Sequence, residues 1–414
     1  MVETIACLLL AGLFYLLSVY VALRSPDSNK SYKSALWIVL AGILFRITLW
    51  PLAPALSDDP FRYRWEGKLQ AAGGNPYDAR PNDPGWAHLR DATFPRVPGK
   101  DFKAVYGPLT ELVEWITYRI ASAEEPDVVR QVFWFKVPYA LCDLAVLTVL
   151  PILLISRGYA ADRVLIYAWS PLPVIAFWAT GHNDSLVILW LALAFLAAAK
   201  QRWTWAFVAL SLAAAAKVWP LLLFPLFIGW RGYRPLRWYQ WWVAVPILLA
   251  LAWPYWTDIH ENLRFMSGFV GGWRNNDSVF GMILWLAKDI YRAKKIAFAI
   301  IAAGAAFVTL RRWPLERGAL AAITLMLMVS ANCHPWYLTW ILPLLTLLPV
   351  PALLLWTALI PIAYSAVITW SALGEWNGST ALRWFEYAPV YGVLAGSWII
   401  GRRTHLRNTA RTVG

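Results

Sequence analysis

Charged residues are scarce in this chain. Only 15% of its 414 residues are Asp, Glu, Lys or Arg, whereas a soluble globular protein has about 25%. The apolar fraction is 59%, and many apolar runs reach about 15 to 20 residues, the length that a bilayer-spanning helix needs. The scarcity of charge therefore excludes an ordinary soluble domain and predicts an all-α, polytopic transmembrane helix bundle.

Cysteine is also scarce, and the three residues Cys7, Cys142 and Cys333 lie far apart. Their spacing excludes a disulfide framework and a cysteine-ligated metal site. The N-terminal Met-Val-Glu lacks the positive region of a cleavable signal peptide, so we expect the first apolar run to be retained. Tryptophan, by contrast, is abundant with 28 residues, which is typical of side chains gathered at membrane interfaces.

The basic residues indicate how the chain is oriented. The net charge is +13, but Lys and Arg lie mainly in short loops between apolar runs. Such loops mark the cytoplasmic side of a membrane protein, so the charge does not indicate a nucleic-acid partner. We predict one domain, residues 1–414, of about thirteen spans, with the N-terminus outside and the C-terminus inside. Longer external segments then cover residues 55–131, 256–292 and 369–388, and the first of them carries interfacial helices.

Unusual polar clusters all fall on the predicted external side. They are Asp58 and Asp59; His182, Asn183 and Asp184; Lys217; Arg274, Asn275, Asn276 and Asp277; and Asn332 and His334. The basic loops alone set the orientation, so this sorting favours one polar site built from several helix ends. Basic residues flank the apolar stretch 203–230 on both sides, so both of its ends are predicted to be cytoplasmic. Lys217 reaches the external side only if the stretch turns near Pro220. Arg46, inside a predicted span, either serves the site or pairs with a neighbouring helix.

The residue types in these clusters suit sugar transfer from a lipid phosphate. Asp58 or Asp59 could remove a proton from an acceptor hydroxyl. Lys217, Arg274 and His334 could hold a phosphate and stabilise its developing charge. Each also has a plainer interpretation, since a lone histidine most often forms a hydrogen bond at a helix end and a lysine can be a snorkelling anchor.

Aromatic residues near the clusters could offer ring faces to a sugar or an isoprenoid chain. We name Trp65, Trp273 and Trp336 for this role, although most aromatic side chains of such a protein serve packing and the membrane interface.

The motifs resemble those of a known superfamily. Residues 58–67 (DDPFRYRWEG) and 74–77 (GNPY) are similar to the first external loop of GT-C glycosyltransferases. The likeness is closest to the bacterial polyprenyl-phosphate-mannose-dependent mannosyltransferases and covers about residues 35–345. Further matching stretches follow along the chain: 181–185 (GHNDS), 217–220 (KVWP), 273–277 (WRNND) and 334–337 (HPWY).

The resemblance implies an integral membrane enzyme that uses a polyprenyl-phosphate sugar, usually with inversion at the anomeric carbon. It implies a base in the first external loop, which is Asp58 or Asp59, and the pattern D-x-x-R-Y favours Asp59. The residues expected to bind donor phosphate or substrate are Lys217, Arg274, His334, His182, Asp184, Arg62, Tyr63, Asn276 and Trp336. Some members need a divalent metal and others do not, and no ligand set in the sequence decides between them.

The expected partners are the lipid-linked sugar, the bilayer, and an acceptor that is a glycan, a glycolipid or a protein. The sugar is expected to be mannose or another hexose, transferred on the extracytoplasmic face of a bacterial inner membrane. The acidic motif follows the second predicted span, whereas in many members it follows the first. The N-terminal helix therefore looks like an addition to the family pattern.

Two other functions fit the same features. A flippase or transporter of lipid-linked sugars also carries charged residues in its spans, but it predicts polar residues at membrane depth and an inverted repeat, and neither is clear here. A ligase or polymerase of lipid-linked glycans shares the chemistry and differs only in the size of its donor.

Overall fold

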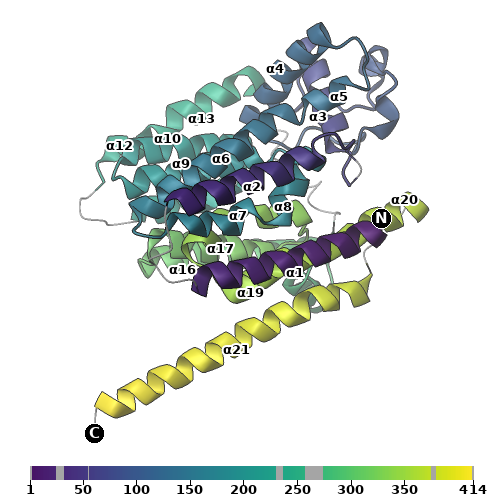
Figure 1. Ribbon diagram of the computed structural model, residues 1–414. Helices are drawn as coiled ribbons and strands as arrows, with labels where there is room; N and C mark the ends of the chain where they lie inside the picture. The colour runs from purple at the N-terminus through teal and green to yellow at the C-terminus, as the bar shows by residue number, and fades with distance from the viewer. Residues whose placement is uncertain are drawn as a thin grey trace.

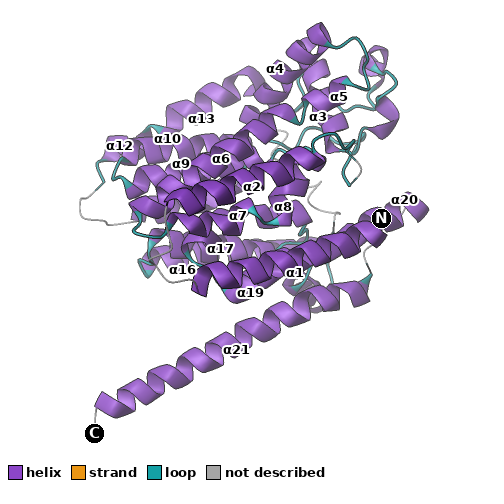
Figure 2. Cartoon of the chain, in the orientation of Figure 1, coloured by secondary structure: helices purple, strands orange, loops and turns teal. Residues whose placement is uncertain are grey.

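The chain is built from helices and the loops that join them. The computed structural model describes residues 2–24, 32–54, 56–229, 236–256, 274–373 and 379–412. Across these ranges no β-strand forms, and the only extended pairing is an isolated bridge between Asn275 and Asn332 (Figure 2). The predicted all-α class is confirmed for this part of the chain. Much of the predicted segment 256–292 and part of 369–388, with Trp273, lie outside the described residues.

The bundle contains helices of very different lengths. In chain order they are α1 (Val2–Arg24), α2 (Tyr32–Leu49), α6 (Val137–Ser156), α7 (Leu165–Ala168), α8 (Pro171–Pro173), α9 (Asp184–Ala199), α10 (Trp203–Ala216), α11 (Phe224–Gly229), α12 (Trp238–Trp242), α13 (Ala244–Ala252), α15 (Val279–Ala287), α16 (Ile290–Leu310), α17 (Leu315–Val329), α18 (Leu342–Leu347), α19 (Pro351–Leu359), α20 (Ser365–Leu373) and α21 (Thr380–Thr412). Short 3-10 or π turns link several of them: η4 (Ala161–Val164), η5 (Val174–Ala179), η6 (Trp219–Leu223), η7 (Trp253–Tyr255), η8 (Pro335–Trp340) and η9 (Ile360–Tyr364).

Only some of these helices have the length and composition of a membrane span. Among the described residues, three do: Val2–Arg24, Gln131–Ser156 and Ile290–Leu310. Other apolar helices are shorter, including Asp184–Ala199 and Trp203–Ala216. The count of about thirteen spans therefore stays a prediction. Proline explains much of the fragmentation, because it cannot donate a backbone hydrogen bond and breaks an apolar run into shorter helices that neighbours complete.

A separate helical unit covers one end of the bundle. It consists of α3 (Asp59–Ala71), α4 (Pro108–Glu124) and α5 (Gln131–Trp134), with the turns η2 (Pro84–Leu89) and η3 (Phe94–Arg96) in its long loops. Figure 1 shows this unit and the N-terminus at the same end of the bundle, with the C-terminus of α21 at the other end. The placement of the two termini on opposite sides of a membrane stays a prediction.

The break that the sequence predicts near Lys217 is present. Helix α10 ends at Ala216, Lys217 has extended backbone, and Pro220 lies in η6. The N-terminus of α4 is attached at the same point, since Gly107 N–H and the Thr110 hydroxyl both donate to the carbonyl of Ala216, at 3.0 and 2.9 Å. The α3–α5 unit is thereby joined to the bundle directly beside Lys217.

Candidate functional site

Asp59 occupies the first turn of α3, at the base of the α3–α5 unit. Its backbone N–H donates to the Ser57 hydroxyl at 3.2 Å, and Pro60 follows at a helix start, where the fixed φ of proline suits the turn. The Asp59 side chain is 25% exposed, so it remains accessible from the solvent side.

Three polar side chains converge on one oxygen of this carboxylate. The Tyr63 hydroxyl, one turn along α3, donates to Asp59 Oδ2 at 3.4 Å, and the Tyr106 hydroxyl donates to it at 3.3 Å. His182 Nδ1 lies 3.2 Å from the same atom. Burial alone would raise the pKa of Asp59, but contact with His182 and the charge of Lys217 outweigh burial and lower it. Asp59 is therefore an ionised carboxylate at neutral pH.

A tight loop brings His182 to Asp59. The π turn η5 ends just before Gly181, whose φ of +73° is a conformation that side chains rarely adopt. A Cβ at Gly181 would also lie 2.8 Å from Lys136 Cγ and 3.3 Å from Pro60 Cγ. Only glycine allows this loop to pass so close to the start of α3.

Lys217 and Asp184 form a second charged group of the site. Lys217 Nζ lies 2.5 Å from Asp184 Oδ1, and Trp340 Nε1 donates to the same oxygen at 2.6 Å. Asp184 is fully buried, while the Lys217 side chain is 14% exposed. Lys217 Nζ also lies 5.9 Å from the ring centre of Tyr106, which contacts Asp59. Tyr106 thus links the ammonium to the carboxylate.

Two histidines from distant loops stack on Trp336. The ring centres of His182 and Trp336 are 3.9 Å apart, and those of His334 and Trp336 are 4.5 Å apart with nearly parallel planes. Trp336 is only 9% exposed, so the sequence-based expectation that its face binds a sugar ring is not supported by its packing. Trp65 is buried as well, against Phe94.

His334 is held in one orientation by a neighbouring amide. Asn275 Nδ2 lies 3.0 Å from His334 Nδ1, and because an amide nitrogen only donates, Nδ1 accepts. Burial, together with the nearby charges of His182 and Lys217, lowers the pKa of His334 to about 3, even though Asp59 opposes the shift. His334 is therefore neutral at pH 7 and supplies no positive charge to a phosphate.

Arg274 and Asn276 belong to an adjoining cluster. Arg274 Nε and Arg383 Nη1 both lie 2.8 Å from Asp277 Oδ1. Asn276 is buried and donates to the carboxylate of Glu386. This cluster reaches the histidines through Asn275, which contacts His334, and through Asn276, which donates to the carbonyl of Cys333. Both predicted binding residues therefore already have protein partners.

Asp58 and Arg62 also have protein partners outside the Asp59 group. Asp58 pairs with Arg96 at 2.5 Å, and both side chains are well exposed. Arg62 donates to Glu66 at 2.6 Å and to the backbone carbonyls of the 98–102 loop. A guanidinium has five N–H groups, and four of these are used here, so Arg62 fastens the loop to α3. The structure thus places Asp59, and not Asp58, among the convergent polar groups.

The residues between His182 and Asp184 leave several buried polar atoms without partners. Within the described part of the chain they are Nε2 of His182, both amide atoms of Asn183, and Asp184 Oδ2. Buried polar groups are normally satisfied, so each such atom needs an explanation. A hydroxyl-rich ligand that enters between Asp59 and Lys217 would supply the missing partners.

The sequence-based analysis missed Tyr106, Trp340 and Arg96. Tyr106 stands alone before Gly107 and Pro108, and no local pattern distinguishes it from other loop tyrosines. Trp340 was detectable in principle, because it lies four residues after Trp336 in an apolar stretch. Arg96 lies 38 positions after Asp58, beyond α3 and η2, a pairing that one sequence cannot reveal.

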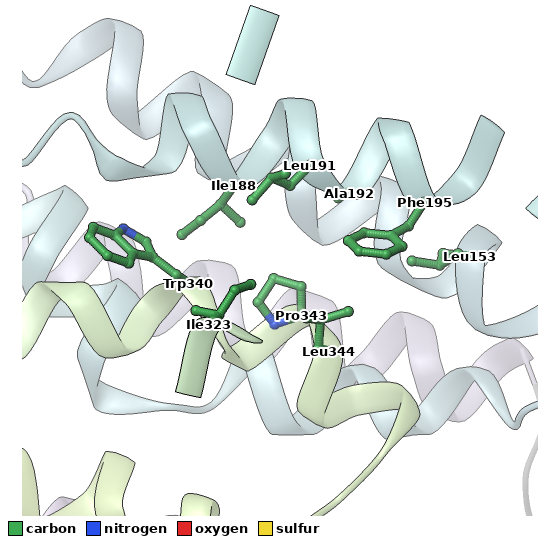
Figure 3. Close-up of a pocket in the computed structure, with 9 residues that line it drawn as sticks. All are labelled: Leu153, Ile188, Leu191, Ala192, Phe195, Ile323, Trp340, Pro343 and Leu344. Atoms are coloured by element: carbon green, nitrogen blue, oxygen red, sulfur yellow. The ribbon is translucent and has the colours of Figure 1, made fainter. Parts of the chain in front are cut away.

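An apolar cavity lies behind Trp340 and is not part of the polar site. Figure 3 shows Trp340 at one end of it, with Ile188 across the cavity and Phe195 and Leu153 at the other end. All lining side chains except Trp340 are purely apolar. The cavity therefore packs the indole ring, whose Nε1 is directed to Asp184, and offers no hydrogen bonds to a sugar.

An all-helical bundle with three helices long and apolar enough to cross a bilayer, among the described residues, indicates a helical membrane protein. The family model "Alpha-(1->6)-mannopyranosyltransferase, N-terminal domain" matches residues 1–233, more than half of the chain. The chain belongs to this family, which confirms the resemblance to GT-C mannosyltransferases and makes it a glycosyltransferase. The match includes Asp59, His182, Asp184 and Lys217. No curated protein and no solved structure matches the chain.

Proposed function

We propose that this protein transfers mannose from a polyprenyl-phosphate donor to a hydroxyl of a glycan acceptor, with inversion, on the extracytoplasmic side of a bacterial inner membrane. The observation that carries the proposal is the ionised Asp59 carboxylate, which faces Tyr63, Tyr106 and His182 with Lys217 close by. A base and a cation close to each other are what a displacement at a sugar phosphate needs. Membership of the mannopyranosyltransferase family supports the sugar.

Asp59 acts as the base in this proposal. The acceptor oxygen attacks the anomeric carbon while Asp59 takes the hydroxyl proton. The bond between that carbon and the phosphate oxygen breaks, and its electron pair leaves with the lipid phosphate. Because the attack inverts the anomeric carbon, an α-(1→6) product requires a β-linked donor. Asp59 then releases its proton to solvent, to which its side chain is 25% exposed.

Lys217 holds the leaving phosphate. An ammonium has three N–H donors, and Asp184 is its one hydrogen-bond partner within the described ranges, so two donors can reach phosphate oxygens. Asp184 in turn holds the ammonium in position. Arg274 is already paired with Asp277 and His334 is neutral, so Lys217 is the main source of positive charge at the site.

The purified full-length protein in liposomes with polyprenyl-phosphate mannose and a panel of mannoside acceptors tests the proposal. We expect transfer by the wild type and a loss of about 10²- to 10⁴-fold in kcat for Asp59→Asn, the usual contribution of a general base. Asp58→Asn is the matched control and should keep its rate within a few-fold, because its partner Arg96 is exposed. Equal losses in both variants, or none in Asp59→Asn, would refute the assignment.

The same vesicles separate the two rival functions. Movement of the labelled lipid across the bilayer without any transfer would indicate a flippase. Transfer only from donors that carry a preassembled glycan would indicate a ligase or polymerase.

The orientation has its own test. Asp101 lies on the exposed loop of the α3–α5 unit. In whole cells, Asp101→Cys should react with a membrane-impermeant maleimide added from outside. Labelling only after the membrane is permeabilised would place the unit, and Asp59 with it, in the cytoplasm.

A further inference from the structure

Three glutamates meet inside the α3–α5 unit, two turns away from Asp59. Glu66 belongs to α3, and Glu111 and Glu114 belong to α4; each is at most 1% exposed. One carboxylate oxygen of each lies within 4.8 Å of the others. The helices are in direct contact here, because a Cβ at Gly67 would lie 2.4 Å from the carbonyl oxygen of Glu114. The packing therefore forces the three carboxylates together.

The protein satisfies only two of the six carboxylate oxygens. Arg62 Nε donates to Glu66 Oε1 at 2.6 Å, and Gln70 Nε2 donates to Glu111 Oε2 at 3.1 Å. The other four oxygens are buried and have no hydrogen-bond partner in the part of the chain that the structure describes. One guanidinium faces three carboxylates, so two negative charges are uncompensated when all three are ionised. Buried charge of this kind is stable only with a counter-charge or with added protons.

A fourth oxygen from the bundle points to the same space. The Tyr139 hydroxyl is fully buried, and no described residue forms a hydrogen bond with it. Among the charged groups around it, Glu114 acts on it most strongly, and Glu111 also acts on it. Tyr139 lies in α6 and not in the α3–α5 unit, so its hydroxyl is an observation independent of the acidic cluster.

We propose that Glu66, Glu111 and Glu114 form a binding site for a divalent cation, Ca²⁺, with the Tyr139 hydroxyl beside it. All the donors are hard oxygens, which suit Ca²⁺ or Mg²⁺ and not zinc. Two oxygens on opposite sides of Ca²⁺ lie about 4.6 to 5.2 Å apart, and the observed spacing of up to 4.8 Å fits this range. Mg²⁺ demands a tighter octahedron and usually keeps several waters, so a buried cage of carboxylates favours Ca²⁺.

The cation would act as a brace between helices and would not touch the substrate. Asp59 and Glu66 lie on one helix, and the helix that carries Glu111 begins where Thr110 bonds to the carbonyl preceding Lys217. A cation that joins α3 to α4 would therefore fix the distance between the Asp59 carboxylate and the Lys217 ammonium. This consequence for catalysis rests on the proposed function, whereas binding of the cation does not.

The test measures binding and stability, separately from transfer. The full-length protein in detergent is treated with EDTA, dialysed against Ca²⁺, and analysed for bound metal by mass spectrometry. We expect one Ca²⁺ per chain and a Tm several degrees higher than in EDTA. Glu114→Gln should weaken Ca²⁺ binding at least about tenfold, because affinity follows the number of charged ligands. Glu124→Gln, at the exposed end of α4, is the matched control and should bind like the wild type.

The wild-type measurements decide the question even if Glu114→Gln does not fold. No bound Ca²⁺ together with an unchanged Tm in EDTA would overturn the proposal and show that the carboxylates share protons instead. Preferential binding of Mg²⁺ or Mn²⁺ would overturn the choice of cation. Ca²⁺ binding by the wild type with no transfer activity would leave the cation site intact and reject the proposed function.

Discussion

Two ion pairs of the bundle, Arg46–Asp143 and Lys217–Asp184, differ in how completely their polar atoms are hydrogen-bonded. Arg46 Nε lies 2.5 Å from Asp143 Oδ2, and both side chains are fully buried. Lys217 Nζ lies at the same distance from Asp184 Oδ1, with Asp184 fully buried. By distance alone the two pairs are alike.

The two ion pairs differ in the hydrogen bonds that their charged groups make with other residues. Asp143 also accepts hydrogen bonds from Tyr167 and Trp178, and Arg46 also donates to the carbonyls of Gly42 and Ala168. Asp184 accepts both of its hydrogen bonds on Oδ1, and Oδ2 has no partner among the described residues. A completed network leaves no place for a ligand, whereas an incomplete one next to a partly exposed lysine does. Completeness of hydrogen bonding, and not burial of charge, distinguishes a structural pair from a site.

Breaking the structural pair should have the largest effect on stability. Arg46→Met leaves Asp143 buried without its counter-charge, so we expect a loss of about 3 to 5 kcal/mol in the free energy of unfolding. Unfolding of the purified protein in mixed micelles with increasing SDS measures it. Arg46→Met combined with Asp143→Leu should recover much of the loss, because no lone charge remains. A double variant no more stable than the single one would mean that shape, and not charge, sets the cost.

Breaking the site pair should affect transfer as well as stability. On the proposed function, Lys217→Met removes charge-assisted hydrogen bonds to the donor phosphate, each worth about 1.5 to 3 kcal/mol, so kcat/KM per folded molecule should fall roughly 10- to 150-fold. Arg46→Met should leave this quantity nearly unchanged. Trp340→Phe, which removes only the second donor to Asp184, is the control and should retain most activity. If Arg46→Met reduced kcat/KM per folded molecule as strongly, the two pairs would not differ in function.

The smallest expected effect is a shift in the pH dependence of kcat/KM in the Lys217→Met variant. The pKa of Asp59 lies below its ordinary value of 3.8, so the proposed base is ionised above that pH and becomes protonated as the pH falls through the lowered pKa. The acid limb of kcat/KM should therefore lie below pH 4. Lys217→Met removes one charge that lowers this pKa, so its limb should move to higher pH. An unmoved limb in a folded variant would show that Lys217 does not act on Asp59.

The sequence predicts the fold class and the place of the site better than the pairing within it. Composition alone indicates the helical class, and Pro220 with the flanking basic residues locates the break at Lys217. The partner of Arg46 lies 97 residues away, and no local pattern connects the two. The role of Arg62 was accessible, because Glu66 follows at the i+4 spacing of helical ion pairs, but the family pattern favoured a substrate-binding role. Span lengths could not be predicted, since prolines divide apolar runs that hydropathy treats as continuous.

The attachment of α4 to the end of α10 also sets when α4 can dock on the bundle during translation. Thr110 and the carbonyl that anchors it are 106 residues apart. A ribosome that adds about 5 to 20 residues per second needs roughly 5 to 20 s to make that interval. The α3–α5 unit is therefore complete well before its anchor exists, and Asp59 takes its place opposite Lys217 only when the later helix arrives.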